Sequence, residues 1–146
     1  MEFTTLSYEI AAPRLMKFPY AVRCILKFQN NSMEEDGTNY MNEIIRPYWR
    51  CTFMSINGED VAVACWYDEQ PLIGHNDLYV SILNVLEDYR GNEYADKLID
   101  HIQQENKRDI VLTAENEALL HGYYLPRNWN LVNAYIGSKD LIRFYA

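Results

Sequence analysis

A turn between a strand-like run and a helix-like run contains the residues best suited to bind an anion. Residues 78–85 have the pattern of a strand, and residues 93–104 have that of a helix. The first backbone N–H groups of a helix lack partners inside the helix, and the helix dipole places partial positive charge there. A turn with small residues lets a phosphate approach those groups. The residues concerned are Arg90, Gly91, Asn92, Glu93, Tyr94 and Ala95.

Three polar side chains near the predicted strands could move a proton. Glu69 follows one strand, Ser81 lies within the next, and Glu115 follows a later one. Each could reach an amine, directly or through water, and so act as a general base. Each also fits a surface charge or a helix cap. The sequence alone does not choose among them.

Histidine and cysteine spacing gives no metal site. His75, His101 and His121 are far apart and show no ligand pattern. The three cysteines, Cys24, Cys51 and Cys65, match neither a disulfide framework nor a paired-cysteine metal site. The first five residues show no basic segment followed by an apolar run, so we expect no secretory signal and a location in the reducing cytoplasm.

The elements that must position these groups follow in the order β, α, α, β, β, β, α, β, α, β, β. Asn57-Gly58 between two strand-like runs is a strong signal for a tight hairpin. Pro19 suits the first turn of a helix, and Pro126 should stop the last one. The predicted strands are residues 2–11, 51–56, 61–67, 78–85, 109–113, 129–136 and 141–145, and the predicted helices are 19–29, 38–46, 93–104 and 115–125. This order predicts an α/β fold with a mixed sheet covered by helices.

Length and charge limit the classes of function. A chain of 146 residues with 49% hydrophobic residues favours a single domain spanning residues 1–146. A formal net charge of −8 disfavours nucleic acid and anionic membranes as partners. No run of about 20 apolar residues is present, so we expect no membrane span.

The turn and its flanks resemble the acetyl-CoA motif of the GCN5-related N-acetyltransferase (GNAT) superfamily. In that motif a strand ends in a V-x-P-like turn, and R/Q-x-x-G-x-G/A opens a helix. Here Arg90 and Ala95 match the ends of the motif, and Gly91 matches a common variant. Downstream, Asn116, the pair Tyr123-Tyr124 and the aromatic Trp129 follow at similar spacing. The likeness is specific from about Leu78 to Trp129 and only topological before that.

The resemblance implies a GNAT-like mixed, mostly antiparallel central sheet flanked by helices, with acetyl-CoA as co-substrate. In the family, backbone amides of the motif hold the pyrophosphate, and pantetheine lies in a gap where the sheet splays. Carried over, the phosphate loop is Arg90 to Ala95, and Leu83 and Val85 belong to the strand beside pantetheine, Val85 making the backbone contact. Asn116 would bind the coenzyme.

The resemblance also implies direct attack of a primary amine on the thioester. A tyrosine of the family protonates the leaving thiolate, which implies Tyr124 here, with Tyr123 as the alternative. Glu115 remains a candidate for the base that takes the amine proton. Acidic residues near Glu34 to Glu43, in the expected substrate wall, suggest a cationic amine such as a polyamine or a peptide amine.

One position departs from the motif. Glu93 stands where the family has its central glycine. Two charges about 5 Å apart at an effective dielectric of about 20 repel by roughly 3 kcal/mol, which is about a hundredfold in affinity. The Glu93 carboxylate could cap its own helix and fill the anion site, or it could turn into water and leave the site usable.

Two functions therefore remain open. The first is an acetyl-CoA-dependent N-acetyltransferase. The second is a catalytically degenerate GNAT-fold protein, such as a viral accessory protein, that binds or inhibits another protein. A homodimer or another protein partner is compatible with either function.

Overall fold

The computed structural model describes residues 1–26, 49–68, 77–132 and 139–146. The predicted helix at residues 38–46 and the candidate base Glu69 lie outside the described residues. So do the ends of the helix that begins at Pro19 and of the predicted strand at residues 129–136.

The N-terminal segment forms a short strand and then a helix. Strand β1 (Glu2–Ser7) is followed directly by α1 (Tyr8–Leu15), so the prediction of one strand through Ala11 is wrong beyond Ser7. Ala11 and Leu15, four residues apart, are both buried, which is helical and not strand periodicity. Pro13 lies inside this helix. Pro19 begins a further helical segment, residues 19–26, as predicted.

The predicted hairpin is confirmed. Strands β2 (Arg50–Ile56) and β3 (Glu59–Tyr67) pair antiparallel on either side of Asn57-Gly58. Both turn residues have positive φ, +52° and +82°, as a type I′ turn requires. Asparagine and glycine are the residues that tolerate this backbone best.

Within the described residues, seven strands form one sheet in the order β1-β2-β3-β4-β5-β7-β6. The remaining strands are β4 (Asp77–Val85), β5 (Asp109–Thr113), β6 (Asn130–Leu131) and β7 (Asp140–Arg143). Every neighbouring pair is antiparallel except β4 and β5, which run parallel. The mixed, mostly antiparallel sheet that the sequence predicted is therefore confirmed.

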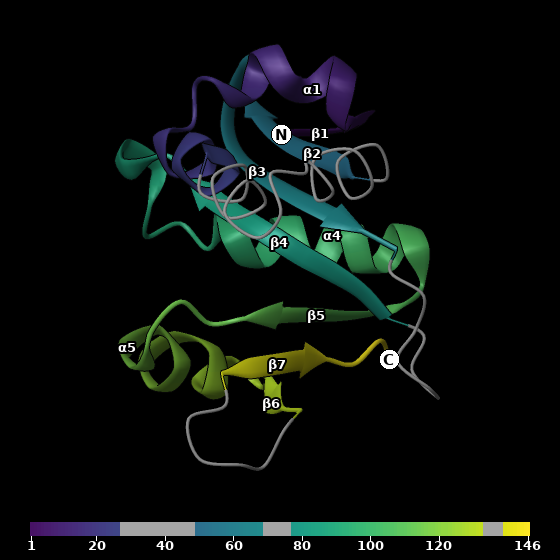
Figure 1. Ribbon diagram of the computed structural model, residues 1–146, viewed down its shortest axis with the longest axis vertical. Coiled ribbons are helices and arrows are strands. Elements are labelled where there is room, and N and C mark those ends of the chain that lie inside the picture. Colours follow the sequence, from purple (N-terminus) through teal and green to yellow (C-terminus); the bar gives the residue numbers. More distant parts are fainter. Residues whose placement is uncertain (27–48, 69–76, 133–138) are drawn as a thin grey trace, which may run out of the picture.

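Helices cover both faces of the sheet. Helix α4 (Tyr94–Asn106) packs Leu98, Ile99 and Ile102 against one face, and β4 crosses in front of it in Figure 1. Helix α1 and residues 19–26 cover the other face, where Leu15 and Phe18 meet side chains of β2 and β3. These two apolar layers fix β4, and with it the turn that leads into α4.

The last helical segment differs from its prediction. It begins as α5 (Glu117–Leu119), widens into the π-helical turn η3 (Leu120–Tyr124) and tightens into the 3₁₀ turn η4 (Leu125–Arg127). Pro126 therefore does not stop the helix, because it lies in the first turn of η4, where a proline needs no N–H partner. The segment ends at Asn128, whose φ is +67°.

Candidate functional site

The central feature is a gap between β4 and β5. These strands pair only where Asp77–Tyr79 faces Asp109–Val111, although β4 continues beside β3 as far as Val85. Beyond Tyr79 the two parallel strands separate, and a cavity of about 630 Å³ opens between them. The splay that the family resemblance implied is therefore present.

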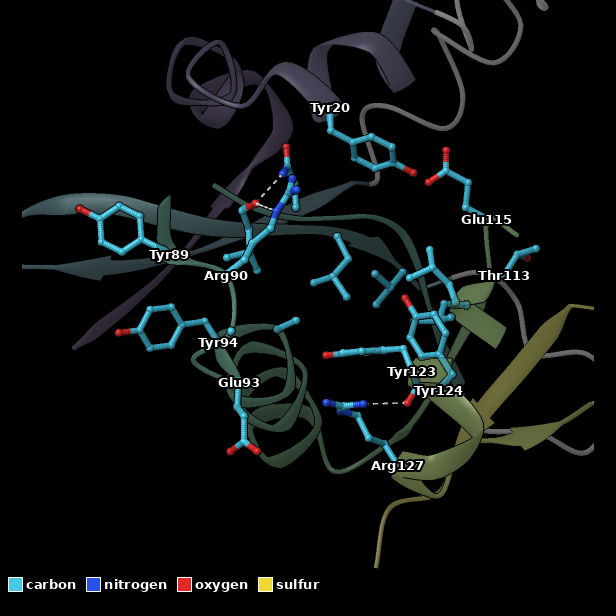
Figure 2. A pocket seen from close by; sticks show the side chains of 18 of the residues that line it. Tyr20, Tyr89, Arg90, Glu93, Tyr94, Thr113, Glu115, Tyr123, Tyr124 and Arg127 are labelled. Carbon is cyan, nitrogen blue, oxygen red and sulfur yellow. Dashed lines mark hydrogen bonds between the residues drawn. The ribbon is translucent and has the colours of Figure 1, made fainter. Parts of the chain in front are cut away.

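The cavity is lined by residues from four parts of the chain. They come from the segment starting at Pro19, from β4 and the turn after it, from the first turn of α4, and from β5 with the helical turns that follow. Figure 2 shows many of these side chains, with tyrosines on several sides of the opening. The predicted site residues that line it are Leu83, Val85, Arg90, Gly91, Glu93, Tyr94, Ala95, Glu115, Tyr123 and Tyr124. The candidate base Ser81 also lines it, and its hydroxyl donates to the Cys65 carbonyl at 3.2 Å.

The start of α4 can bind an anion at the edge of this cavity. The first bond inside the helix runs from the Lys97 N–H to the Glu93 carbonyl, at 3.1 Å. The N–H groups of Tyr94, Ala95 and Asp96 precede it and have no partner within the helix. Tyr94 and Ala95 line the cavity, so these donors and the positive end of the helix dipole lie at its wall.

Gly91 shapes the turn through its backbone. Its φ is +85°, a conformation that side-chain-bearing residues rarely adopt. A Cβ at this position would meet nothing within 4 Å. The glycine is therefore required by the backbone angle and not by lack of space.

Glu93 also has a left-handed backbone, with φ +61° and ψ +25°, and it is the N-cap residue of α4. Its side chain makes no capping hydrogen bond and is exposed. In Figure 2 its carboxylate points away from the middle of the cavity. Of the two arrangements considered from the sequence, this geometry matches the carboxylate in water and leaves the helix start open.

Arg90 links the turn back to β4. Its Nε donates to the Val85 carbonyl oxygen at 3.1 Å, and the Asn84 side-chain amide donates to the same oxygen at 3.2 Å. Both bonds are visible in Figure 2. The outer end of the exposed Arg90 guanidinium remains at the cavity wall, where it can meet a phosphate.

Tyr123 and Tyr124 occupy the opposite wall and differ in their partners. The Tyr123 hydroxyl donates to Asp96 Oδ1 at 3.1 Å, and the Arg127 guanidinium lies 3.9 Å from the centre of its ring. Tyr124 packs edge-on against Tyr123 and Trp129. Among the described residues its hydroxyl has no hydrogen-bond partner, and it points into the cavity in Figure 2.

Burial raises the pKa of both phenols. For Tyr124, burial acts first and the negative charges of Asp96 and Glu115 add to it. For Tyr123, burial again comes first, followed by the charge of Asp96 and the hydrogen bond to it. Both side chains therefore keep their protons at neutral pH, and Tyr124 holds its proton where a ligand in the cavity could take it.

Comparison with solved structures gives the fold. Gcn5 from Tetrahymena matches with a TM-score of 0.57 at 14% identity, covering 100% of this chain and 97% of that one. The PaiA N-acetyltransferase of Thermoplasma acidophilum, solved with coenzyme A, matches with a TM-score of 0.61 at 12% identity, covering 99% and 100%. A ribosomal-protein-alanine N-acetyltransferase of Brucella melitensis matches with a TM-score of 0.58 at 19% identity, covering 93% and 98%.

The chain has the GNAT fold. No family model and no curated protein matches the sequence, so the likeness is carried by structure. The GNAT-like fold that the motif implied is confirmed. The roles of individual residues in this GNAT fold remain predictions.

Two predicted coenzyme ligands do not line the cavity of this GNAT fold. The Asn92 side chain donates to the Tyr89 carbonyl at 3.0 Å, which closes the turn. The Asn116 side chain accepts from the Leu119 N–H at 2.9 Å and caps α5. Each side chain therefore stabilises the local backbone, Asn92 as a turn-closing donor and Asn116 as a helix N-cap.

The sequence analysis missed several cavity residues, and three of them are polar or charged side chains that bear on the site: Tyr20, Asn84 and Arg127. Asn84 had a detectable signal, because it is the polar member of the alternating buried positions Leu78, Val80, Ile82 and Asn84. Tyr20 and Arg127 had none, because only the tertiary fold brings the helix at residues 19–26 and η4 to the cavity.

No group of three or more histidine, cysteine, aspartate or glutamate side chains among the described residues could hold a metal ion. No described helix is long and apolar enough to cross a membrane.

Proposed function

We propose that this protein is an acetyl-CoA-dependent N-acetyltransferase that acts on a primary amine. The observation that carries the proposal is one cavity that combines the open gap between β4 and β5, a free helix start and an unpaired tyrosine hydroxyl. Several structural neighbours carry acetyltransferase names, and two were solved with coenzyme A, which supports the same class of reaction.

The donor groups fit the charged part of the coenzyme. Backbone N–H groups of Tyr94 to Asp96 and the Arg90 guanidinium suit a pyrophosphate. The gap beside Leu83 and Val85 offers partly apolar walls for a pantetheine chain. Acetyl-CoA would supply an activated thioester at the inner end of that gap.

The chain's own residues then have two tasks. A base removes a proton from the acceptor ammonium, so that the amine nitrogen can form a bond to the carbonyl carbon. Tyr124 gives its proton to the sulfur as the carbon–sulfur bond breaks, and its raised pKa keeps that proton available until then. The products are an amide and a free thiol.

The alternative, a degenerate GNAT-fold binding or inhibitor protein, drew its main support from Glu93. An exposed carboxylate that makes no capping bond and points away from the cavity supports the enzyme instead. We therefore favour catalysis.

The direct test is release of free thiol from acetyl-CoA in the presence of primary amines, starting with spermidine and a lysine-containing peptide. We expect amine-dependent thiol release by the wild type and a loss of about 10²-fold or more in Tyr124→Phe. Glu117→Gln, which removes an exposed carboxylate paired with His121, is the matched control and should stay unchanged. Absence of turnover with every amine, together with absence of coenzyme binding, would contradict the proposal.

A further inference from the structure

Two residues from distant parts of the chain face each other at the mouth of the cavity. Tyr20 comes from the first turn of the helical segment at residues 19–26, and Glu115 follows β5. Both line the cavity, and Figure 2 shows the Tyr20 hydroxyl directed toward the Glu115 carboxylate. The mouth therefore holds a phenol and a carboxylate in reach of the same ligand.

The phenol is the proton donor of this pair. Burial raises the pKa of Tyr20, and hydrogen bonding to Cys24 and Glu115 raises it further. A phenol that stays protonated can donate to a carboxylate but cannot compete with it for a cation. The arrangement leaves the second carboxylate oxygen of Glu115 for a ligand.

A buried amide fixes the turn that carries Tyr20. Asn84 Oδ1 accepts from the backbone N–H of Ala21 at 3.3 Å, and its Nδ2 donates to the Val85 carbonyl at 3.2 Å. Asn84 is 5% exposed, so bulk water does not compete for its hydrogen-bonding groups. This bridge ties the residue next to Tyr20 to the strand that borders the gap.

Four charged side chains line the cavity: Arg90, Glu93, Glu115 and Arg127. The Glu93 carboxylate points away from the middle of the cavity in Figure 2, so the other three define two regions of charge. Arg90 lies on the side of the helix start, and Arg127 lies below and is paired with Asp96 at 3.2 Å. Glu115 stands apart from both arginines in Figure 2, where the Tyr20 hydroxyl is directed toward it, and its negative charge also acts on Tyr124. An anion is drawn to the first region and a cation to the second.

We propose that Tyr20 positions Glu115, and that this pair forms the site that receives the ammonium group of a cationic primary amine. The inference rests on the proposed function and names the acceptor side of the same cavity. Glu115 is the catalytic base and Tyr20 is a positioning residue.

The proton balance is simple. The acceptor ammonium transfers one proton to a Glu115 oxygen and becomes a neutral amine. The amine nitrogen then forms the bond to the acyl carbon while the carbon–sulfur bond breaks, and Tyr124 protonates the sulfur. The nitrogen loses its second proton to solvent, Glu115 releases the proton that it took to solvent, and the phenolate of Tyr124 regains one from solvent.

A pair of acceptors tests the base. The first is the alkylamine found in the amine screen, and the second is an O-alkylhydroxylamine of equal length, which is uncharged at neutral pH and needs no deprotonation before attack. We expect Glu115→Gln to lower kcat/KM for the alkylamine by about 10²–10³-fold and for the uncharged analogue by less than tenfold. Equal losses for both acceptors, or no loss for either, would overturn the role of Glu115.

The positioning role is tested by Tyr20→Phe. We expect about a tenfold loss of kcat/KM for the alkylamine, with the KM for acetyl-CoA and the activity toward the uncharged analogue nearly unchanged. A purely structural role for Tyr20 would move all of these values together, and wild-type behaviour would also refute the assignment. Glu117→Gln again serves as the control carboxylate.

Binding without the coenzyme separates this inference from the proposed function. Calorimetric titration of the protein alone with spermidine should show binding that Glu115→Gln weakens by tenfold or more and Glu117→Gln leaves unchanged. That result supports the ammonium site even if coenzyme A fails to bind. No spermidine binding, or equal binding by wild type and Glu115→Gln, overturns the site even if coenzyme A binds.

Discussion

At the residue scale, the two adjacent tyrosines of η3 show how neighbours in sequence acquire different roles. The Tyr123 hydroxyl donates a hydrogen bond to Asp96, whereas the Tyr124 hydroxyl points into the cavity. The family resemblance implied Tyr124 and left Tyr123 as the alternative. The choice depends on the π-helical turn, whose extra residue per turn sets the direction of each ring.

Paired phenylalanine variants test this difference. We expect Tyr124→Phe to lower kcat by about 10²-fold or more, because the thiolate would leave unprotonated. Tyr123→Phe should keep most of the activity and lose about 1 kcal/mol of stability with its bond to Asp96. Measurements of kcat and of chemical unfolding for both variants test these roles. A larger kcat loss in Tyr123→Phe than in Tyr124→Phe would make Tyr123 the acid instead.

The same assignment predicts a pH dependence. Burial, Asp96 and Glu115 raise the pKa of Tyr124 above its ordinary value of about 10. The acid therefore stays protonated through neutral and mildly alkaline pH. The kcat loss that reports its deprotonation should therefore have its midpoint above about pH 10, in a profile measured at saturating substrate. A decline centred near pH 8 would exclude Tyr124 as the acid.

Glu93 combines an unfavourable backbone with a charge beside the anion site. A left-handed backbone costs a residue with a side chain about 1–2 kcal/mol, and glycine escapes that cost while losing roughly 0.5–1 kcal/mol in chain entropy. We therefore expect Glu93→Gly to stabilise the fold by about 0.5–1 kcal/mol. Because the carboxylate is exposed and points outward, affinity for coenzyme A should rise by less than tenfold.

Glu93→Gln is the matched control, because it removes the charge and keeps the backbone strain. Glu93→Gln should leave stability nearly unchanged and should raise the affinity for coenzyme A by the same small factor as Glu93→Gly. A gain of a hundredfold or more in either variant would show that the carboxylate occupies the phosphate site after all.

At the element scale, α1 is held to the β2–β3 hairpin by a partly buried ion pair. Arg14 Nε and Nη2 donate to Asp60 at 2.8 and 2.6 Å, and Ser55 donates to the same carboxylate at 2.7 Å. The hydrogen bond from Arg14 is the main cause of the lowered pKa of Asp60, with Ser55 and the charge of Arg14 adding to it. The pair fixes the face of the sheet on which Tyr20 lies.

Asp60→Asn should therefore lower the free energy of unfolding by about 1–2 kcal/mol at neutral pH. This value already allows for solvent screening of the pair, because the Arg14 side chain is 35% exposed. A lowered folded-state pKa gives stability that is present above the unfolded value of about 3.9 and lost as the pH falls through the folded value. The difference in the free energy of unfolding between wild type and Asp60→Asn should thus shrink below about pH 4. Urea unfolding across that range measures it, and a difference that grows toward low pH would contradict the ion-pair account.

The elements that the sequence predicted well are those whose signals are local. Asn57-Gly58 fixed the hairpin through backbone angles that these two residues tolerate. The stripe of Leu98, Ile99 and Ile102 located α4 within two residues at each end. Helix α1 was missed because Tyr8 to Ala11 was assigned to the first strand, whereas the helix begins at Tyr8 and contains Pro13. The stop predicted at Pro126 was wrong because this proline lies in the first turn of η4.

At the scale of the whole molecule, the order of elements was enough to predict a mixed sheet, but not where it opens. The opening depends on β4 continuing beside β3 after its pairing with β5 has ended. No residue of either strand encodes that separation alone. The same holds for the mouth of the cavity, where Tyr20 and Glu115 meet only through the packing of residues 19–26 over the sheet.

Titration calorimetry of the wild-type protein with coenzyme A tests the central claim most directly. The open helix start and the gap between β4 and β5 predict binding in the micromolar range, about −8 kcal/mol, with Glu93→Gly binding slightly more tightly. Binding should weaken in Arg90→Ala and stay unchanged in Glu117→Gln. Absence of binding by both the wild type and Glu93→Gly would contradict the account, because the fold would then be a GNAT fold without a coenzyme site.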